Sequence, residues 1–127
     1  MTTIRWQKYC VLGAGVSGAM AVGFAAMSAH GMEAQPADWL ERGSRFQLIH
    51  AVALIALGLG RGQGRWLKAS SLLFLLGSIL FSGSLYAMAL ASLPVVFLVP
   101  IGGSCFILGW LALACGALSP GLRQDPT

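Results

Sequence analysis

The sequence predicts an all-α fold, an integral membrane four-helix bundle formed as a single transmembrane domain over residues 1–127. The chain is 57% hydrophobic and only 9% charged, with a mean hydropathy of +0.77. A soluble domain carries about 25% charged residues, so this chain has too few charges to cover a surface that faces water. Its charges also stand in short clusters between long apolar runs, as in polytopic membrane proteins.

A first membrane helix is predicted at about residues 9–30, because the apolar run from Tyr9 to Ala29 follows two basic residues. At about 1.5 Å per residue, this run can cross a hydrocarbon core of about 30 Å. Ala26-Met27-Ser28 resembles a signal-peptide cleavage site, but the run is longer than the apolar region of a typical signal peptide. We therefore expect a retained transmembrane helix.

The first helix contains the pattern G-x-G-x-x-G at Gly13, Gly15 and Gly18, the fingerprint of dinucleotide-binding turns. Such a turn needs a preceding strand and further strand–helix units, whereas three more membrane-length apolar runs follow here. In lipid, small residues instead let helices approach closely. We interpret Gly13 and the spaced set of Gly15, Ala19 and Gly23 as helix-packing residues, for another helix of this chain or for a helix of a partner.

The second membrane helix is predicted at about residues 44–60, after a short interfacial helix at about 36–42. Pro36 suits the first position of the short helix, and Gly43 suits its end. Ser44 and Gln47 fit the capping box S-x-x-Q just before an apolar run, which is a typical helix start.

The third and fourth membrane helices follow a basic loop at residues 61–68. The third is predicted at about 66–92, and Pro94 ends it. Pro100 suits the first turn of the fourth helix, at about 100–118, because an N–H group has no intrahelical partner there. A short polar tail covers residues 119–127.

The distribution of lysine and arginine predicts that the N- and C-termini are both cytoplasmic. In this orientation the outer side holds only two basic residues, Arg42 and Arg45. The inner side holds six: Arg5, Lys8, Arg61, Arg65, Lys68 and Arg123. The sequence therefore predicts a multi-pass protein of a bacterial inner (cytoplasmic) membrane.

Polar residues recur at a similar predicted depth, in the outer half of the bundle. Intramembrane polar groups are costly in lipid and usually face the bundle interior. We therefore predict a shared polar layer, which is also the candidate ligand site: His30, Gln47, His50, Ser82, Ser84 and Tyr86.

Most of these residues also have an interpretation that needs no ligand. Gln47 suits the Ser44 cap, and the hydroxyl groups suit hydrogen bonds to the backbone or across helices. Small residues near the layer are predicted to let helices pack closely, namely Gly83, Gly102, Gly103 and Gly109.

The two histidines are the residues that would ligate a metal or a haem. No cysteine or carboxylate is predicted within the layer as a third ligand, so we predict no metal site and no cofactor, and hydrogen bonding is the preferred role. The four acidic residues all fall in predicted loops or the tail. No acid–base or nucleophile set converges, so we expect no enzymatic activity.

Four sequence blocks together resemble the YgdD/YwdK-like family of small membrane proteins, a domain of unknown function to which a mitochondrial transmembrane family is related. The blocks are SAHG at 28–31, FQLIHA at 46–51, LFSGSLYAM at 80–88 and PIGGSCFILGW at 100–110. The resemblance implies a four-helix integral membrane protein and implies no activity. The sequence departs from the family pattern at Phe46, where tyrosine is usual, and at Val99, where a hydroxyl residue is common.

Two functions are compatible with these features. The leading hypothesis is a non-catalytic accessory or assembly subunit that packs against a larger membrane protein complex. The alternative is a binder or conduit for a small ligand, such as haem, quinone or an ion, at the polar layer. The expected partners are the lipid bilayer and other membrane protein subunits. No basic face suits nucleic acid, and the loops are too short to form a site for a soluble substrate.

Overall fold

The computed structural model describes residues 2–119, with side chains from Arg5 onward, and shows four helices. The third of them is one continuous helix in three segments, of which the middle one is π-helical. The elements are α1 (Thr2–Ser28), α2 (Ala34–Leu59), α3 (Arg65–Gly77), η1 (Ser78–Ser82), α4 (Gly83–Ala91) and α5 (Leu98–Ala117). Three spans are long and apolar enough to cross a membrane: Arg5–Ser28, Arg65–Ala91 and Leu98–Ala117.

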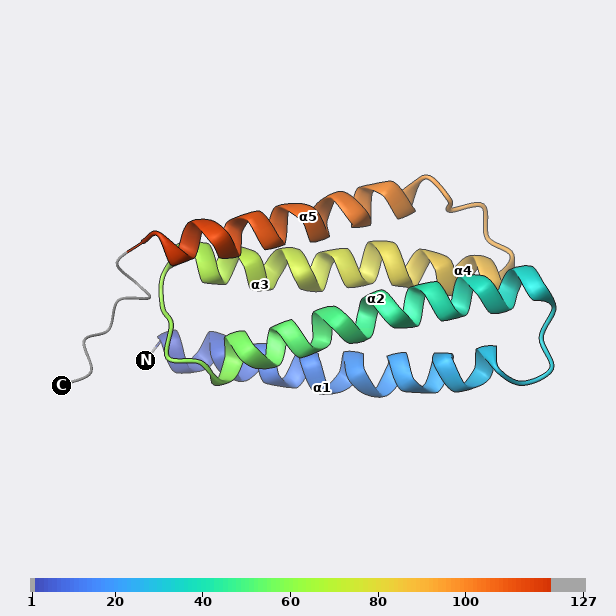
Figure 1. Ribbon diagram of the computed structural model, residues 1–127, viewed down its shortest axis with the longest axis horizontal. Helices are drawn as coiled ribbons and strands as arrows, with labels where there is room; N and C mark the ends of the chain where they lie inside the picture. Colours follow the sequence, from blue (N-terminus) through green and yellow to red (C-terminus); the bar gives the residue numbers. More distant parts are fainter. Residues whose placement is uncertain (1, 120–127) are drawn as a thin grey trace.

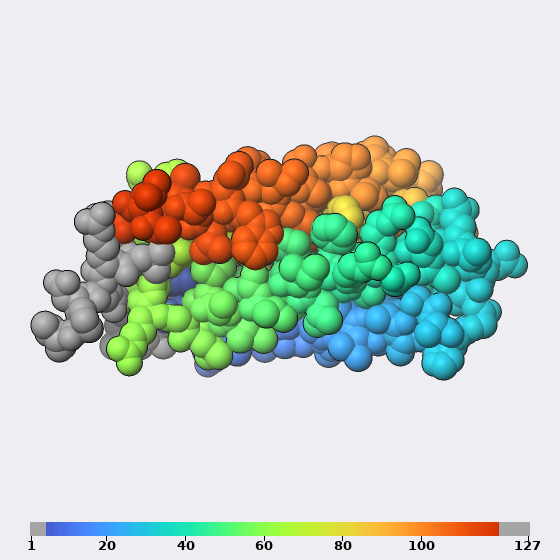
Figure 2. Space-filling model, in the orientation of Figure 1, coloured from blue at the N-terminus to red at the C-terminus, as the bar shows by residue number. Residues whose placement is uncertain are grey.

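The helices run alternately up and down and lie side by side (Figure 1). α1 packs along α2, and α5 packs along α3 and η1, while α2 also contacts η1 and α4. Figure 2 shows the resulting surface, on which α2 separates α1 from α5. The start of α1, the α2–α3 connection and the end of α5 lie at one end of the bundle, and the other two connections lie at the opposite end. Short connections between antiparallel neighbours are typical of such bundles.

The prediction of a short helix at 36–42 followed by a separate helix at 44–60 is wrong, because α2 is one helix from Ala34 to Leu59. Gly43 lies inside this helix, where its small size admits the ring of Tyr86. An added Cβ would lie 2.8 Å from Cε1 of that ring. Ser44 is not a cap, since its hydroxyl donates to the carbonyl of Glu41 at 2.9 Å. A pattern of S-x-x-Q thus lies in mid-helix here.

The other helices differ from the prediction mainly at their ends. α1 begins at Thr2 and ends at Ser28 instead of spanning 9–30, so His30 lies outside it in the connection to α2. Gly31 there has a φ of 68°, which favours glycine. The third helix, residues 65–91, is close to the predicted 66–92, and α5 is close to the predicted 100–118. The predicted tail lies almost wholly outside the described residues, and so does Arg123.

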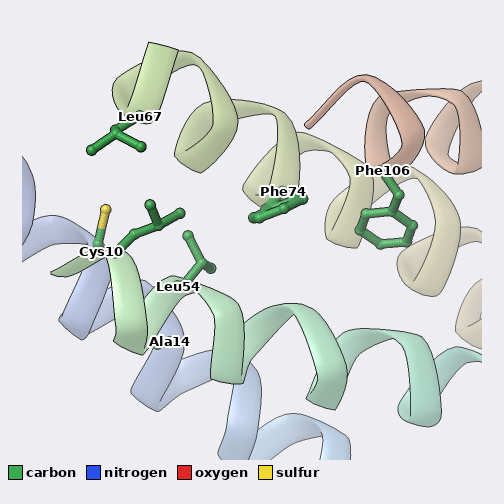
Figure 3. Packing of buried hydrophobic residues seen from close by; sticks show 7 residues of the cluster. Cys10, Ala14, Leu54, Leu67, Phe74 and Phe106 are labelled. Atoms are coloured by element: carbon green, nitrogen blue, oxygen red, sulfur yellow. The ribbon is translucent and has the colours of Figure 1, made fainter. Parts of the chain in front are cut away.

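The hydrophobic core lies where all four helices meet (Figure 3). Leu54 of α2 and Phe74 of α3 are both fully buried, and Phe106 of α5 is 4% exposed. α1 adds the small buried side chains of Cys10 and Ala14, and its partly buried Trp6 packs against the core. The core is therefore built from few large side chains, while many large apolar residues face outward. An outward apolar surface is what a surrounding hydrocarbon phase requires.

Glycines allow the closest contacts between α5 and the third helix. A Cβ on Gly102 would lie 2.7 Å from Cα of Phe81, and a Cβ on Gly109 would lie 2.6 Å from the ring of Phe74. Gly103 has ordinary contacts only, because the nearest atom of the Phe81 ring is 3.8 Å away. Gly83 has nothing within 4 Å, so it makes no close helix contact. Two close-contact glycines have no counterpart in the prediction: Gly58, against α1, and Gly77, against α5.

The packing face predicted on α1 does not pack against this chain. An added Cβ on Gly15 or Gly23 would meet nothing within 4 Å, and Ala19 is exposed. Only Gly13 approaches a neighbour, at 3.0 Å from a methyl group of Leu75. The bundle instead contacts the opposite side of α1, which carries the buried residues Cys10, Ala14, Ser17 and Ala21. The small residues of α1 therefore form an outward face.

Candidate functional site

The polar residues of the helices extend from the middle of the bundle toward the end that holds the α1–α2 and α4–α5 connections. Because α2 begins at Ala34, Gln47 and His50 lie near its centre and not in its first two turns. Ser78 is the central residue of the Arg65–Ala91 span, and Ser82 lies one turn beyond it. Gln47, His50, Ser78 and Ser82 are all buried. The layer is therefore internal. Ser78 lies at the centre of its helix, and Ser82 and Tyr86 follow toward the end of the bundle that was predicted to be outer.

One group of contacts joins α2 to the third helix. The hydroxyl of Tyr86 donates to Oε1 of Gln47 at 2.6 Å, and the hydroxyl of Ser82 donates to the carbonyl of Gly43 at 2.7 Å. The ring of Tyr86 stacks on Phe24 of α1, with 4.0 Å between ring centroids. Gln47 is thus a partner of Tyr86 and not of a helix cap. These hydrogen bonds satisfy polar groups that lipid could not satisfy.

A second group surrounds His50 with aromatic rings. The imidazole stacks on Phe106 at a centroid distance of 3.6 Å, with the planes 9° apart. Its Nδ1 is 2.6 Å from the carbonyl oxygen of Phe46, and the indole N–H of Trp110 donates to its Nε2 at 3.0 Å. We refer to these residues, with Phe74 at the edge of the imidazole, as the aromatic cluster: Phe46, His50, Phe74, Phe106 and Trp110.

The two hydrogen bonds define the state of His50. A carbonyl oxygen can only accept, so Nδ1 must carry the hydrogen, and Nε2 must present the lone pair that Trp110 requires. The imidazole is therefore neutral, with both nitrogens in use. A metal ion or haem iron would have to displace the indole of Trp110 to reach Nε2. Within residues 2–119, no group of three or more metal-binding side chains comes together. The arrangement suits a structural hydrogen bond across α2 and α5.

Two of the predicted layer residues stand apart from these contacts. His30 is exposed and lies in the connection after α1, so the structure does not bring it to His50. The hydroxyl of Ser84 donates to the carbonyl of Leu80 in its own helix, which is the ordinary way for serine to be satisfied in a membrane helix. Of the predicted residues, the layer therefore retains Gln47, His50, Ser82 and Tyr86. Ser78 and Trp110 join it.

Ser78 and Trp110 are the main residues without a predicted role at this site. Ser78 is 5% exposed, and its hydroxyl has no hydrogen-bond partner within the described part of the chain. A signal for it exists in the sequence, because Ser71, Ser78 and Ser82 recur at helical spacing on one side of the third helix. Trp110 falls within the family-like block at 100–110, but no spacing rule links it to His50, which is 60 residues away.

Fold and site together define an all-α membrane protein of four helices, three of which are candidate membrane spans, with an internal layer of neutral polar groups. The chain belongs to the family described as "Protein of unknown function (DUF423)", whose sequence profile matches residues 24–103. It is therefore a small membrane protein of the UPF0382, or YgdD-like, group. The matched region contains all of the predicted polar layer.

Similar proteins come from several bacteria. A UPF0382 membrane protein of Haemophilus influenzae is 39% identical over 117 residues, covering 87% of this chain and 94% of the relative. The UPF0382 inner membrane protein YgdD of Escherichia coli K12 is 34% identical over 119 residues, covering 88% and 91%. A UPF0382 membrane protein of Staphylococcus epidermidis is 38% identical over 122 residues, covering 88% and 96%. No solved structure matches the chain. These relatives and the apolar spans identify an inner membrane protein.

Proposed function

We propose that this protein is a non-catalytic accessory or assembly subunit, which packs against a larger membrane protein complex through the outward face of α1. The observation that carries the proposal is the position of Gly15, Ala19 and Gly23. They share one side of α1, and no part of the bundle that the structure describes covers that side. Small residues spaced four apart let two transmembrane helices approach closely in lipid. A second helix on this face would come from outside the chain.

The state of the ionisable groups supports a non-catalytic role. Asp38 pairs with Arg42 at 2.9 Å and Glu41 pairs with Arg45 at 2.5 Å, all four on the exposed first turns of α2. Both nitrogens of His50 are held by hydrogen bonds within the protein. General acid–base catalysis needs a titratable group within reach of a substrate. His50 does line a cavity of about 380 Å³, but both of its nitrogens are already engaged, and the other four groups are paired on the surface.

We also propose that both termini are cytoplasmic. The start of α1 and the α2–α3 connection lie at the same end of the bundle (Figure 1). That end carries five basic residues within the described part of the chain: Arg5, Lys8, Arg61, Arg65 and Lys68. At the other end, Arg42 and Arg45 are paired with acidic side chains. Lysine and arginine gather on the cytoplasmic side of membrane proteins, which supports this orientation.

The alternative function, binding of a small ligand at the polar layer, is favoured only for an uncharged organic molecule. A haem or a metal ion would compete with Trp110 for Nε2 of His50. An ion conduit would need a continuous polar path, whereas the layer borders the apolar side chains of Leu54 and Phe74. A quinone requires neither a ligating nitrogen nor a polar path.

The test compares the size of the complex in native membranes for two matched alanine-to-leucine variants. Ala19→Leu fills the outward face of α1, and Ala114→Leu adds the same volume at an exposed position of α5. The tagged chain is produced at its natural level, extracted with a polymer that retains lipid, and sized on native gels. We expect the wild-type protein and Ala114→Leu to migrate in a large complex, and Ala19→Leu to migrate as the free chain.

Two results would contradict the proposal. One is migration of the wild-type chain as a lone monomer after gentle extraction. The other is an equal shift for Ala19→Leu and Ala114→Leu, which would mean that the α1 face has no special part in association. Far-ultraviolet circular dichroism of both purified variants checks that their helices are retained. Mass spectrometry of the wild-type complex then names the subunits that Ala19→Leu releases.

A further inference from the structure

A groove runs between α1 and the third helix, on a side of α1 that the bundle leaves partly uncovered. Its volume is about 520 Å³, which lies within the usual range of 300–1,000 Å³ for small-molecule sites. Its walls are apolar, with Leu12, Val16 and Met20 from α1 and Leu75 and Ile79 from the third helix. We call it the α1 groove. Its shape and lining suit an elongated molecule that dissolves in lipid.

Two glycines, Gly13 and Gly83, line the groove and add no side chain to it. An added Cβ on Gly83 would meet no atom within 4 Å, so the space above this residue is empty. Close helix approach therefore does not explain Gly83. Absence of a side chain at this position leaves room for a separate molecule.

Two of the polar residues that line the groove, Ser78 and Gln47, have donor groups without an acceptor in the described part of the chain. Ser78 lines the groove, is 5% exposed, and its hydroxyl has no partner within residues 2–119. Gln47 also lines the groove and is 4% exposed. Its Oε1 accepts from Tyr86, while its amide N–H₂ group has no acceptor among the described residues. Buried polar groups almost always have partners, so an acceptor supplied from outside the chain would complete both residues.

A ligand that pairs with these donors must bring an acceptor, and a carbonyl oxygen is an acceptor with two lone pairs. An amide N–H₂ group only donates, and the Tyr86 hydroxyl has already used its hydrogen on Gln47. A hydrocarbon chain in the groove would leave Ser78 and the Gln47 amide unpaired. A ring or chain carbonyl accepts from both, and its apolar remainder matches the walls. The site therefore distinguishes a carbonyl compound from a plain hydrocarbon.

The depth of the groove selects among carbonyl compounds. Ser78 is the central residue of the Arg65–Ala91 span, so the donors lie near the middle of the bilayer. The ester carbonyls of phospholipids lie at the edge of the hydrocarbon core, about 15 Å from its centre. A quinone dissolves in the core as a whole molecule and brings its ring carbonyls to that depth.

We propose that the α1 groove is a binding site for a lipid-soluble quinone, whose ring carbonyl accepts hydrogen bonds from Ser78 and the Gln47 amide. The π-helical segment begins at Ser78, and single π-helical turns within α-helices are frequent at functional sites. The proposal concerns binding alone. It rests on the alternative function, ligand binding at the polar layer, and not on the association through Gly15, Ala19 and Gly23. The two sites are neighbours on α1, because Leu12 and Val16 line the groove and stand one turn from Gly15 and Ala19.

The experiment measures binding of a short-chain ubiquinone with a single isoprenoid unit to the full chain in phospholipid nanodiscs. Equilibrium dialysis gives the bound fraction, and empty nanodiscs give the background from partition into lipid. An isoprenylbenzene with the same tail and no carbonyl is the matched probe. We expect saturable binding of the quinone and at least about tenfold weaker binding of the hydrocarbon, because the carbonyl forms two hydrogen bonds.

Ser78→Ala and Ser70→Ala are a matched pair of variants. Both remove a buried hydroxyl that has no partner in the described chain, but only Ser78 lines the groove. We expect Ser78→Ala to weaken quinone binding by about three- to tenfold, the effect of one hydrogen bond, and Ser70→Ala to leave it unchanged. A purely structural serine would give equal results for the two variants, and that outcome would overturn the proposal.

A second pair of variants tests whether the ligand occupies the volume of the α1 groove, independently of the hydrogen bond from Ser78. Gly83→Leu fills the groove, whereas Gly15→Leu adds the same side chain on the open face of α1. We expect saturable binding to be lost in Gly83→Leu and retained in Gly15→Leu. Binding that survives Gly83→Leu overturns the site. The proposal is also overturned if nanodiscs with the protein take up no more quinone than empty nanodiscs. It is overturned as well if a phospholipid co-purifies in the groove and the quinone does not displace it. If Gly83→Leu does not fold, the serine pair decides.

Discussion

The indole N–H of Trp110 donates to Nε2 of His50 at 3.0 Å and joins the middle of α2 to α5. This hydrogen bond is one of the two that allow a histidine to lie at this depth. The carbonyl of Phe46 accepts from Nδ1, so both polar atoms of the imidazole are satisfied while its faces pack on aromatic rings. His50 therefore acts as a polar link within an apolar cluster, which is a structural role.

Trp110→Phe should destabilise the bundle by about 1 kcal/mol. The phenyl ring preserves much of the packing on Phe74, but Nε2 of His50 loses its donor inside the membrane. Interhelical hydrogen bonds in membrane proteins contribute about 0.6 kcal/mol on average and up to about 1.7 kcal/mol. The free energy of unfolding in mixed detergent micelles, followed by far-ultraviolet circular dichroism, measures the effect.

Trp66→Phe is the control for this variant. Trp66 is 37% exposed at the start of α3 and lies outside the aromatic cluster. We expect its replacement to change the free energy of unfolding by less than about 0.5 kcal/mol. An equal loss of unfolding free energy in both variants would mean that the buried surface of tryptophan causes the effect, and that the hydrogen bond to His50 does not.

Gly102→Ala should destabilise the protein, whereas Gly103→Ala should not. A Cβ at residue 102 meets the backbone of Phe81 and Leu80, which cannot rotate away, so α5 must move off the third helix. Overpacking of this kind costs about 1–3 kcal/mol. At residue 103 the nearest atom is 3.8 Å away, and alanine favours a helix by up to about 1 kcal/mol. The same unfolding measurement on both variants checks the difference, and equal values would contradict it.

Sequence alone predicts the long apolar elements well, because membrane thickness sets their length. α5 and the third helix begin and end close to the predicted residues. α1 begins at Thr2 and not at residue 9, and α2 is one helix where two were predicted. The error in α2 arises because Gly43 and Ser44 each fit two kinds of position. Glycine ends helices in water, but at a helix crossing it admits a neighbour, and only the position of Tyr86 shows which applies. The hydroxyl of Ser44 donates to the carbonyl of Glu41 in the same helix. The local sequence is the same for this arrangement as for a helix cap, so it cannot tell the two apart.

The sequence predicts most of the residues of the polar layer, but it does not predict which of them form hydrogen bonds with each other. Helical spacing places Ser82 and Tyr86 on one side of a helix, yet it does not say that they meet Gly43 and Gln47. Those contacts depend on the position of α2 along the axis of the third helix. Close packing at glycines sets that position. His30 shows the converse. It resembles a layer residue in sequence, but α1 ends before it.

A double-mutant cycle of Tyr86→Phe and Gln47→Leu should give a coupling free energy of about 1 kcal/mol. The Tyr86 hydroxyl donates to Oε1 of Gln47 at 2.6 Å in a buried position. Each single variant leaves the other group unpaired, whereas the double variant removes both, so the losses should not add. Unfolding free energies of the four proteins give the coupling. A value near zero would mean that the two residues act independently.

Reporter fusions should place both termini in the cytoplasm. The bundle end that holds the start of α1 and the α2–α3 connection carries Arg61, Arg65 and Lys68, and positive charges near span ends are retained on the cytoplasmic side. A green fluorescent protein fused after the last residue should therefore fluoresce, and alkaline phosphatase fused there should be inactive. Inserted after Glu33, the phosphatase should be active. Replacing the three basic residues with glutamine should weaken this preference, because the paired arginines at the opposite end would then compete, and an unchanged reporter ratio would show that other features orient the chain.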